Sequence, residues 1–133
     1  MKRPELAITI ILRVLGCAAV CAIPAIFMPY AWMNAIHGYL GLGQLPDTPI
    51  VSYLARSLSM FYAMFGVISL YASSDVRRHR ELVTLLAVMS ILLGVTLFGI
   101  DYGSGMPTHW TIVEGPFTIL IGVAILWLQR RAT

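Results

Sequence analysis

Charged residues are scarce in this chain. Of its 133 residues only 11% are charged, while 59% are hydrophobic. Soluble domains carry about 25% charged residues and about 45–50% apolar ones. So few charged side chains cannot cover a water-facing surface, and the apolar residues come in long blocks. The composition therefore excludes an ordinary soluble domain and predicts an integral membrane protein.

Sequence motifs for known chemistry are also missing. There is no nucleotide-binding loop, no nucleophile elbow, no zinc motif and no nucleic-acid patch. The only two cysteines, Cys17 and Cys21, are four positions apart in the first apolar block, a poor geometry for a disulfide and not the Cys-x-x-Cys spacing of a redox pair. Small packing residues are the favoured interpretation of both. The sequence thus names no metal, cofactor, nucleic-acid partner or catalytic residue.

Four apolar blocks cover about residues 6–28, 50–73, 82–100 and 111–128. Each is close to the roughly 20 residues that a helix needs to cross the hydrocarbon core of a bilayer. Between the first two, a short helix over about residues 30–38 is predicted along the membrane interface, with Pro29 at its first turn and Gly38 past its end. The predicted fold is an all-α, integral membrane four-helix bundle, forming one transmembrane domain over residues 1–133.

The basic residues predict how the spans are oriented. Residues 29–49 and 101–110 contain no Lys or Arg, and the basic clusters lie at the opposite ends of the spans. These clusters are Lys2 and Arg3, then Arg77, Arg78 and Arg80, then Arg130 and Arg131. Because cytoplasmic flanks of membrane helices are enriched in Lys and Arg, we expect a multi-pass protein of the inner (plasma) membrane with both termini in the cytoplasm.

A cleaved signal is the alternative for the first span. Met1-Lys-Arg suits the start of a signal, and Val14-Leu-Gly-Cys17 resembles a lipoprotein cleavage site. Against this, Glu5 and Arg13 interrupt the signal pattern, and the apolar run continues past Cys17. The uncleaved span is therefore favoured, and cleavage stays open.

Small and weakly polar residues at helical spacing predict the inner faces of the spans, because helices meet in lipid through such residues. In the first span the predicted face is Arg13, Gly16, Cys17, Ala18 and Cys21, and in the second it is Ser52, Arg56, Ser59, Ala63, Gly66, Ser69 and Ser73. In the third span it is Thr84, Ala87, Ser90, Gly94 and Asp101, and in the fourth it is Thr111, Glu114, Gly115, Thr118, Gly122 and Gln129.

Ionisable residues within spans are costly and mark a functional site or a structural pair. Arg56 and Glu114 have opposite charges at similar depths near the outer ends of their spans, so we expect them to pair. Asp101 is a second possible partner for Arg56. An outward-facing polar pocket follows from this arrangement, and its predicted ligand-binding residues are Arg56, Glu114, Asp101, His109 and His37.

Structural interpretations compete with this pocket. Thr111-x-x-Glu114 has the spacing of a capping box at a helix start. Arg56 also fits a buried strut bonded to Glu114, to Asp101 or to backbone carbonyls. Arg13 lies close enough to the inner end of its span to reach the interface with its charged head.

One string carries a family resemblance. The segment Leu54-Ala-Arg-Ser-Leu-Ser-Met-Phe-Tyr-Ala-Met-Phe-Gly66, together with polar residues at helix boundaries such as Asp101 and Glu114, resembles the DoxX-like group of small bacterial membrane proteins. The resemblance implies a four-helix bundle. Some members of that group are quinone-linked oxidoreductase subunits, and no residue role follows from the likeness.

Three functions are compatible with these observations. The favoured one is a non-catalytic accessory subunit that binds a lipid or quinone in the outward pocket, alone, as a homo-oligomer or within a larger membrane complex. The rival is a small membrane enzyme, of redox or isomerase type, that uses Glu114 or Asp101 as proton donor or acceptor. The third is an oligomeric transporter protomer, which the lack of an inverted repeat disfavours.

Overall fold

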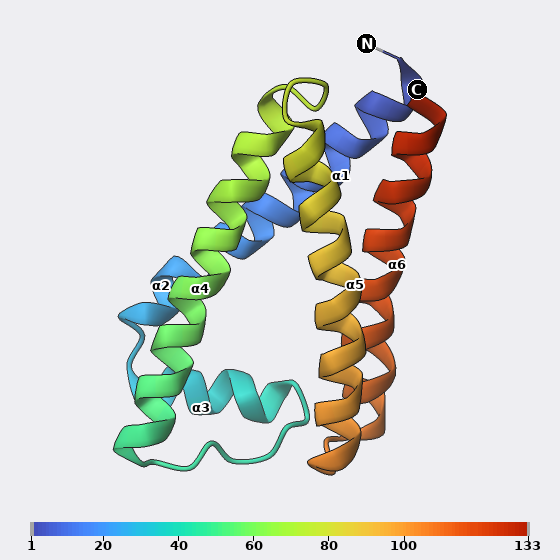
Figure 1. Cartoon of the computed structure of the whole chain (residues 1–133). Helices are drawn as coiled ribbons and strands as arrows, with labels where there is room; N and C mark the ends of the chain where they lie inside the picture. The colour runs from blue at the N-terminus through green and yellow to red at the C-terminus, as the bar shows by residue number, and fades with distance from the viewer. Residues whose placement is uncertain (1, 133) are drawn as a thin grey trace. The chain divides into compact units, whose positions relative to one another are not determined.

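The computed structural model describes residues 2–132, and over this range the chain is helical with no strand. The helices are α1 (Arg3–Val20), α2 (Ile23–Ile26), α3 (Tyr30–Tyr39), α4 (Pro49–Ser74), α5 (Arg80–Gly103) and α6 (Thr108–Ala132) (Figure 1). The all-α fold is confirmed. The short helix expected at residues 30–38 is α3.

Four helical stretches are long and apolar enough to cross a membrane. They are Arg3–Ile26, Pro49–Ser74, Arg80–Gly103 and Thr108–Ala132. These stretches contain almost all of the four predicted spans and extend most of their ends by a few residues. The chain is therefore a multi-pass membrane protein, and its helices are compatible with the expected bundle.

The first span is interrupted near one end. Helix α1 ends at Val20, and the single turn of α2 begins at Ile23 with Pro24 in its first positions. A proline has no N–H to donate, and its ring clashes with the carbonyl four residues earlier, which here is that of Val20. The break at Pro24 therefore follows from the sequence.

The chain divides into two compact units. Unit 1 contains the residues up to Val14 and those from Ser69 onward, while unit 2 is Leu15–Ile68. Unit 1 thus holds the first turns of α1, the last turns of α4, and all of α5 and α6. A single transmembrane domain over residues 1–133 stays a prediction.

In unit 1, α5 and α6 run side by side in opposite directions (Figure 1). Glycines set their separation. A Cβ atom on Gly94 would lie 2.6 Å from the carbonyl oxygen of Gly115, and one on Gly122 would lie 2.5 Å from that of Ala87. The two backbones approach this closely only because these positions lack a side chain, as expected for helices that meet in a bilayer.

Unit 2 has the same kind of contact between the end of α1 and the middle of α4. A Cβ atom on Gly66 would lie 2.7 Å from the carbonyl oxygen of Gly16 and 2.9 Å from the backbone nitrogen of Val20. The loop after α3 is tied to that helix, because Tyr30 Oη donates to the carbonyl of Leu45 and Asn34 Oδ1 accepts from the Leu45 N–H at 2.8 Å.

The predicted inner faces hold for most of α4, α5 and α6. Their buried residues include Ala63, Gly66, Ser69, Ser73, Ala87, Ser90, Gly94, Asp101, Thr111, Gly115, Gly122 and Gln129. Small size and helical spacing therefore identified these faces correctly.

The predicted inner face of α1 is wrong except at Gly16. Its buried residues are Glu5, Ile8, Thr9, Leu12 and Gly16, whereas Arg13, Cys17, Ala18 and Cys21 are exposed. Larger apolar side chains fill the core along this helix, so a search for small residues selected the adjacent face. The packing role expected for the two cysteines is also wrong, because both are exposed free thiols.

Candidate functional site

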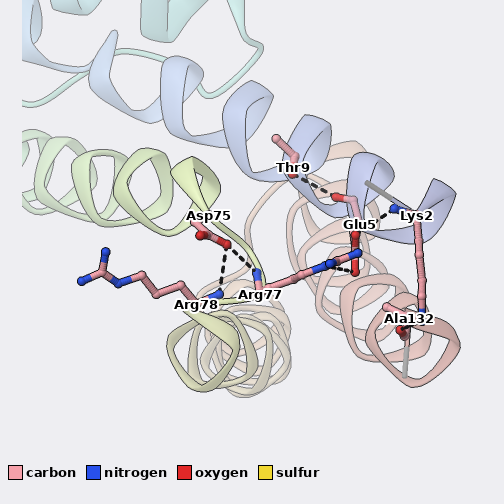
Figure 2. Close-up of polar contacts among 7 residues, drawn as sticks. All are labelled: Lys2, Glu5, Thr9, Asp75, Arg77, Arg78 and Ala132. Carbon is pink, nitrogen blue, oxygen red and sulfur yellow. Dashed lines mark hydrogen bonds and ion pairs between the residues drawn. The ribbon is translucent and has the colours of Figure 1, made fainter.

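An ion pair lies at what we call the basic end of unit 1, where α1 begins, α4 turns into α5, and α6 ends. The Nε atom of Arg77 donates to Oε1 of Glu5 at 2.6 Å (Figure 2). The two side chains differ in exposure, since Glu5 is 6% exposed and Arg77 is 65% exposed. A buried carboxylate needs such a partner, because an uncompensated charge away from water is costly.

The rest of the Glu5 carboxylate is also satisfied. Its Oε2 atom accepts the backbone N–H of Lys2 at 2.8 Å, which caps the first turn of α1 (Figure 2). The hydroxyl of Thr9 donates to the carbonyl of Glu5 at 2.9 Å. The hydrogen bond that Arg77 donates to Glu5, together with the negative charge of Glu5, raises the pKa of the Arg77 guanidinium. Arg77 therefore stays charged at any physiological pH.

Asp75 shapes the turn that presents Arg77. Its Oδ1 atom accepts the backbone N–H groups of Arg77 at 3.2 Å and Arg78 at 3.0 Å. Figure 2 shows that the Arg77 side chain then points toward Glu5, while the Arg78 side chain points the other way. Two adjacent arginines of one cluster thus have different surroundings.

Further hydrogen bonds join the two termini of unit 1 and the start of α5. Lys2 Nζ donates to the carbonyl of Ala132 at 2.8 Å. Gln129 Nε2 donates to the carbonyl of Arg80 at 3.1 Å, and its Oε1 accepts the hydroxyl of Thr84 at 3.1 Å. These bonds hold α6 against α5 at the level of the basic end.

Two clefts flank the Glu5–Arg77 pair. The first cleft has a volume of about 280 Å³ and is lined by Lys2, Glu5, Ile8, Val76, Arg77, Arg80, Gln129 and Ala132. The second has a volume of about 480 Å³ and is lined by Glu5, Leu6, Thr9, Ile10, Arg13, Ser73, Ser74, Asp75, Val76 and Arg77. Each cleft combines charged and hydroxyl or amide groups with apolar side chains.

The first cleft is the more positive of the two, because it has three basic side chains and one acidic one. Within residues 2–132, the side chains of Arg80 and Arg13 make no hydrogen bond and no ion pair. Each cleft therefore has one guanidinium that is available to a ligand. Apolar side chains, such as Ile8 in the first cleft and Ile10 in the second, lie beside it.

Arg56, which was predicted to line an outward pocket, is bound to its own unit. Its three nitrogen atoms donate to Ser52 Oγ at 3.1 Å, to the carbonyl of Ile26 at 2.5 Å and to that of Met28 at 3.0 Å. These carbonyls follow the break at the end of the first span, where helix ends leave acceptors without partners. A strut bonded to backbone carbonyls, one of the structural interpretations of Arg56, is confirmed.

Glu114 has a different role from the capping box considered for it. Helix α6 begins at Thr108, so Thr111 is already inside the helix, where its hydroxyl donates to the carbonyl of Pro107 at 3.4 Å. The capping box is therefore wrong. Instead, Oε2 of Glu114 accepts the indole N–H of Trp110 at 2.7 Å.

Asp101 lies near Glu114 in unit 1. Asp101 is 5% exposed, and its Oδ2 atom has no hydrogen-bond partner in the described part of the chain. Its carboxyl group acts electrostatically on that of Glu114. The structure therefore brings two of the predicted site residues together as a pair of acids near the ends of α5 and α6 that lie away from the basic end.

The predicted five-residue pocket is divided between the units. His37 belongs to unit 2 with Arg56, and its Nδ1 atom lies 3.0 Å from the carbonyl oxygen of Gly43. His109 is an exposed residue of unit 1, in the first turn of α6. The pairing of Arg56 with Glu114, and the single pocket, stay predictions.

Sequence reasoning missed the Glu5–Arg77 pair, because it treated Glu5 only as an interruption of a signal pattern. The sequence did contain a clue to the pair, since Glu5 is the only acidic residue before Asp47 and lies on the side of the membrane where the basic clusters were expected.

No group of three or more His, Cys, Asp or Glu residues suited to a metal ion occurs over residues 2–132. Comparison with models of protein families, with curated proteins and with solved structures gave no match to this chain.

Proposed function

We propose that this chain is a non-catalytic protein of the inner (plasma) membrane that binds the head group of an anionic phospholipid at its basic end. Both termini would lie in the cytoplasm, as the distribution of Lys and Arg indicates. The observation that supports the proposal is the pair of clefts beside Glu5 and Arg77, each with an arginine side chain that has no hydrogen-bond or ion-pair partner among residues 2–132.

The chemistry of the clefts suits a phosphate group joined to acyl chains. Arginine binds phosphate through several N–H donors, so Arg80 and the outer nitrogen atoms of Arg77 can hold a head group together. The clefts lie at the ends of the spanning helices, at the level expected for lipid head groups. Acyl chains would continue along the apolar surface that the helices present to the bilayer.

The sequence-based hypothesis placed a lipid or quinone in the outward pocket. The basic end suits a ligand better, because Arg56 already donates to Ser52 and two carbonyls, whereas Arg80 and Arg13 have no such partners among residues 2–132. An accessory role in a larger membrane complex or a homo-oligomer remains part of the proposal. The resemblance to the DoxX-like group and the transporter interpretation stay predictions from the sequence.

One observation favours a second candidate, a membrane enzyme with a carboxyl acid or base. Asp101 is buried near Glu114, and its Oδ2 atom has no hydrogen-bond partner among residues 2–132. Carboxyl groups in such surroundings are candidates for general acid–base chemistry. A hydrophobic substrate would then react at the end of unit 1 that lies away from the basic end.

Native mass spectrometry with added phosphatidylglycerol or phosphatidylcholine tests the lipid proposal. The variants are Arg80→Gln and Arg13→Gln, and the control is Arg78→Gln. All three remove one positive charge, but Arg78 lines neither cleft. A general charge effect is worth about 1 kcal/mol per basic residue near an anionic surface, whereas a hydrogen bond to a charged group is worth about 1.5–3 kcal/mol.

We expect Arg80→Gln to weaken phosphatidylglycerol binding by roughly 10-fold or more, with a smaller effect for Arg13→Gln. Arg78→Gln should change it by at most about 5-fold. Equal effects of all three variants would show that the basic end attracts anionic lipid only as a diffuse charge. Equal binding of phosphatidylglycerol and phosphatidylcholine would refute the preference for an anionic head group.

A further inference from the structure

The antiparallel packing of α5 and α6 fixes where Asp101 lies. Gly94 faces Gly115 across this contact. Asp101 lies two turns after Gly94 on α5, and Thr108 lies two turns before Gly115 on α6. Because the two helices are antiparallel, Asp101 and Thr108 lie at the same level. Side chains on a helix lean toward its N-terminus, so the carboxyl group of Glu114 reaches back from the second turn of α6 toward this level.

The surroundings of the two acids are unfavourable for two negative charges. Asp101 is 5% exposed, Glu114 is half-buried, and one oxygen atom of Asp101 has no hydrogen-bond partner within residues 2–132. The one donor to the Glu114 carboxyl group found among those residues is the indole of Trp110. Two carboxyl groups that share a poorly solvated site cannot both ionise at low cost, and a proton between them removes both the repulsion and the unpaired oxygen.

We propose that Asp101 and Glu114 form a proton-binding site, in which one proton is shared between the two carboxyl groups at neutral pH. The pair then carries a single negative charge. One carboxyl group supplies the O–H donor and the other the accepting oxygen, which gives the unpartnered oxygen atom of Asp101 a hydrogen bond. The ligand is a proton from the aqueous phase beside this end of unit 1. The inference is independent of the lipid site at the basic end.

Two other ionisable side chains lie on the turns of α5 and α6 that hold the two acids. In the last two turns of α5 the only other ionisable side chain is the exposed Tyr102. In the first two turns of α6 the only ionisable side chain besides Glu114 is the exposed His109.

Infrared spectroscopy of the whole protein in liposomes tests the inference, because a protonated carboxyl group has a C=O stretching band separate from those of a carboxylate. We expect this band in the wild type at pH 7 and its loss as pH is raised. Asp101→Asn and Glu114→Gln should each abolish it, since either change removes the repulsion that retains the proton. Glu81→Gln, an exposed acid in the first turn of α5, should leave the band unchanged.

Absence of the band from the wild type at pH 7 would overturn the inference. So would its persistence in either Asp101→Asn or Glu114→Gln, because a proton held by one acid alone is not shared. Loss of the band on adding sodium chloride at constant pH would show that the pair takes a metal cation, which also overturns it. If the variants fail to fold, wild type labelled with carboxyl-¹³C in aspartate or in glutamate decides the question. A proton that the two carboxyl groups hold in turn gives each group a share of the band, so each label should shift part of it. A band that only one label shifts would overturn the inference.

Discussion

The glycines between α5 and α6 give the sharpest prediction about stability. An alanine at position 122 would place its Cβ atom 2.5 Å from the carbonyl oxygen of Ala87, and one at position 94 would place it 2.6 Å from that of Gly115. Ordinary contacts of a Cβ atom begin at 3.4 Å. The nearest atoms belong to the backbone, so a side-chain rotation cannot relieve the clash and the helices must separate.

The size of the effect follows from what holds these helices together. A separation of about 0.5–1 Å forfeits about a quarter to a half of the dispersion energy between facing atoms. Dispersion is a main attraction between helices in lipid, where there is no hydrophobic driving force between them. We therefore expect Gly94→Ala and Gly122→Ala each to lower the free energy of unfolding by about 1–3 kcal/mol.

Gly99 supplies a matched control on the same helix. A Cβ atom there would meet nothing within 4 Å, so Gly99→Ala should be neutral or should stabilise the protein by up to about 1 kcal/mol through helix propensity. Reversible unfolding in mixed micelles, followed by circular dichroism, measures all three variants. The packing argument is refuted if Gly94→Ala and Gly122→Ala are as stable as Gly99→Ala.

Three further predictions concern the charged residues and the orientation. Glu5→Gln and Arg77→Gln should each lower the free energy of unfolding, because each single change leaves one charge without its partner. The double variant should lose less stability than the two single losses added together. Strictly additive losses in the same unfolding assay would contradict the ion pair. Arg56→Gln should cost about 1.5–3 kcal/mol, because two carbonyls lose a charged donor. Its effect should add to that of Glu114→Gln, since the three nitrogen atoms of Arg56 already have partners, and a large coupling would instead support the predicted pair. A C-terminal fusion to a reporter that fluoresces only in the cytoplasm should fluoresce, whereas activity of a periplasmic reporter at that position would reverse the topology.

The spans and most inner faces could be predicted because both depend on local sequence. Twenty-residue apolar stretches have few alternatives to a membrane helix, and glycines such as Gly94 and Gly122 mark close contacts whichever helix they meet. The face of α1 could not be found in this way, because Ile8 and Leu12 are apolar residues that suit lipid and protein equally well. Only the partner helices decide which of two adjacent faces is covered.

The candidate sites were less predictable, because they depend on which distant residues meet. Glu5 and Arg77 are far apart in the chain, and no periodicity relates them. Arg56 was correctly recognised as a residue that needs partners, but its partners are backbone carbonyls, which have no sequence signature. Asp101 and Glu114 were expected to lie near each other, and the antiparallel packing of α5 and α6 supports that expectation.

The most direct test of the central claim is photo-crosslinking of the wild-type protein with an anionic phospholipid that has a photoreactive group near its phosphate. The clefts at the basic end predict cross-links to α1 around Arg13 and to the turn and first residues of α5 around Arg80, with competition by phosphatidylglycerol but not by phosphatidylcholine. Cross-links spread evenly along the spans, or gathered near Asp101 and Glu114, would contradict a lipid site at the basic end.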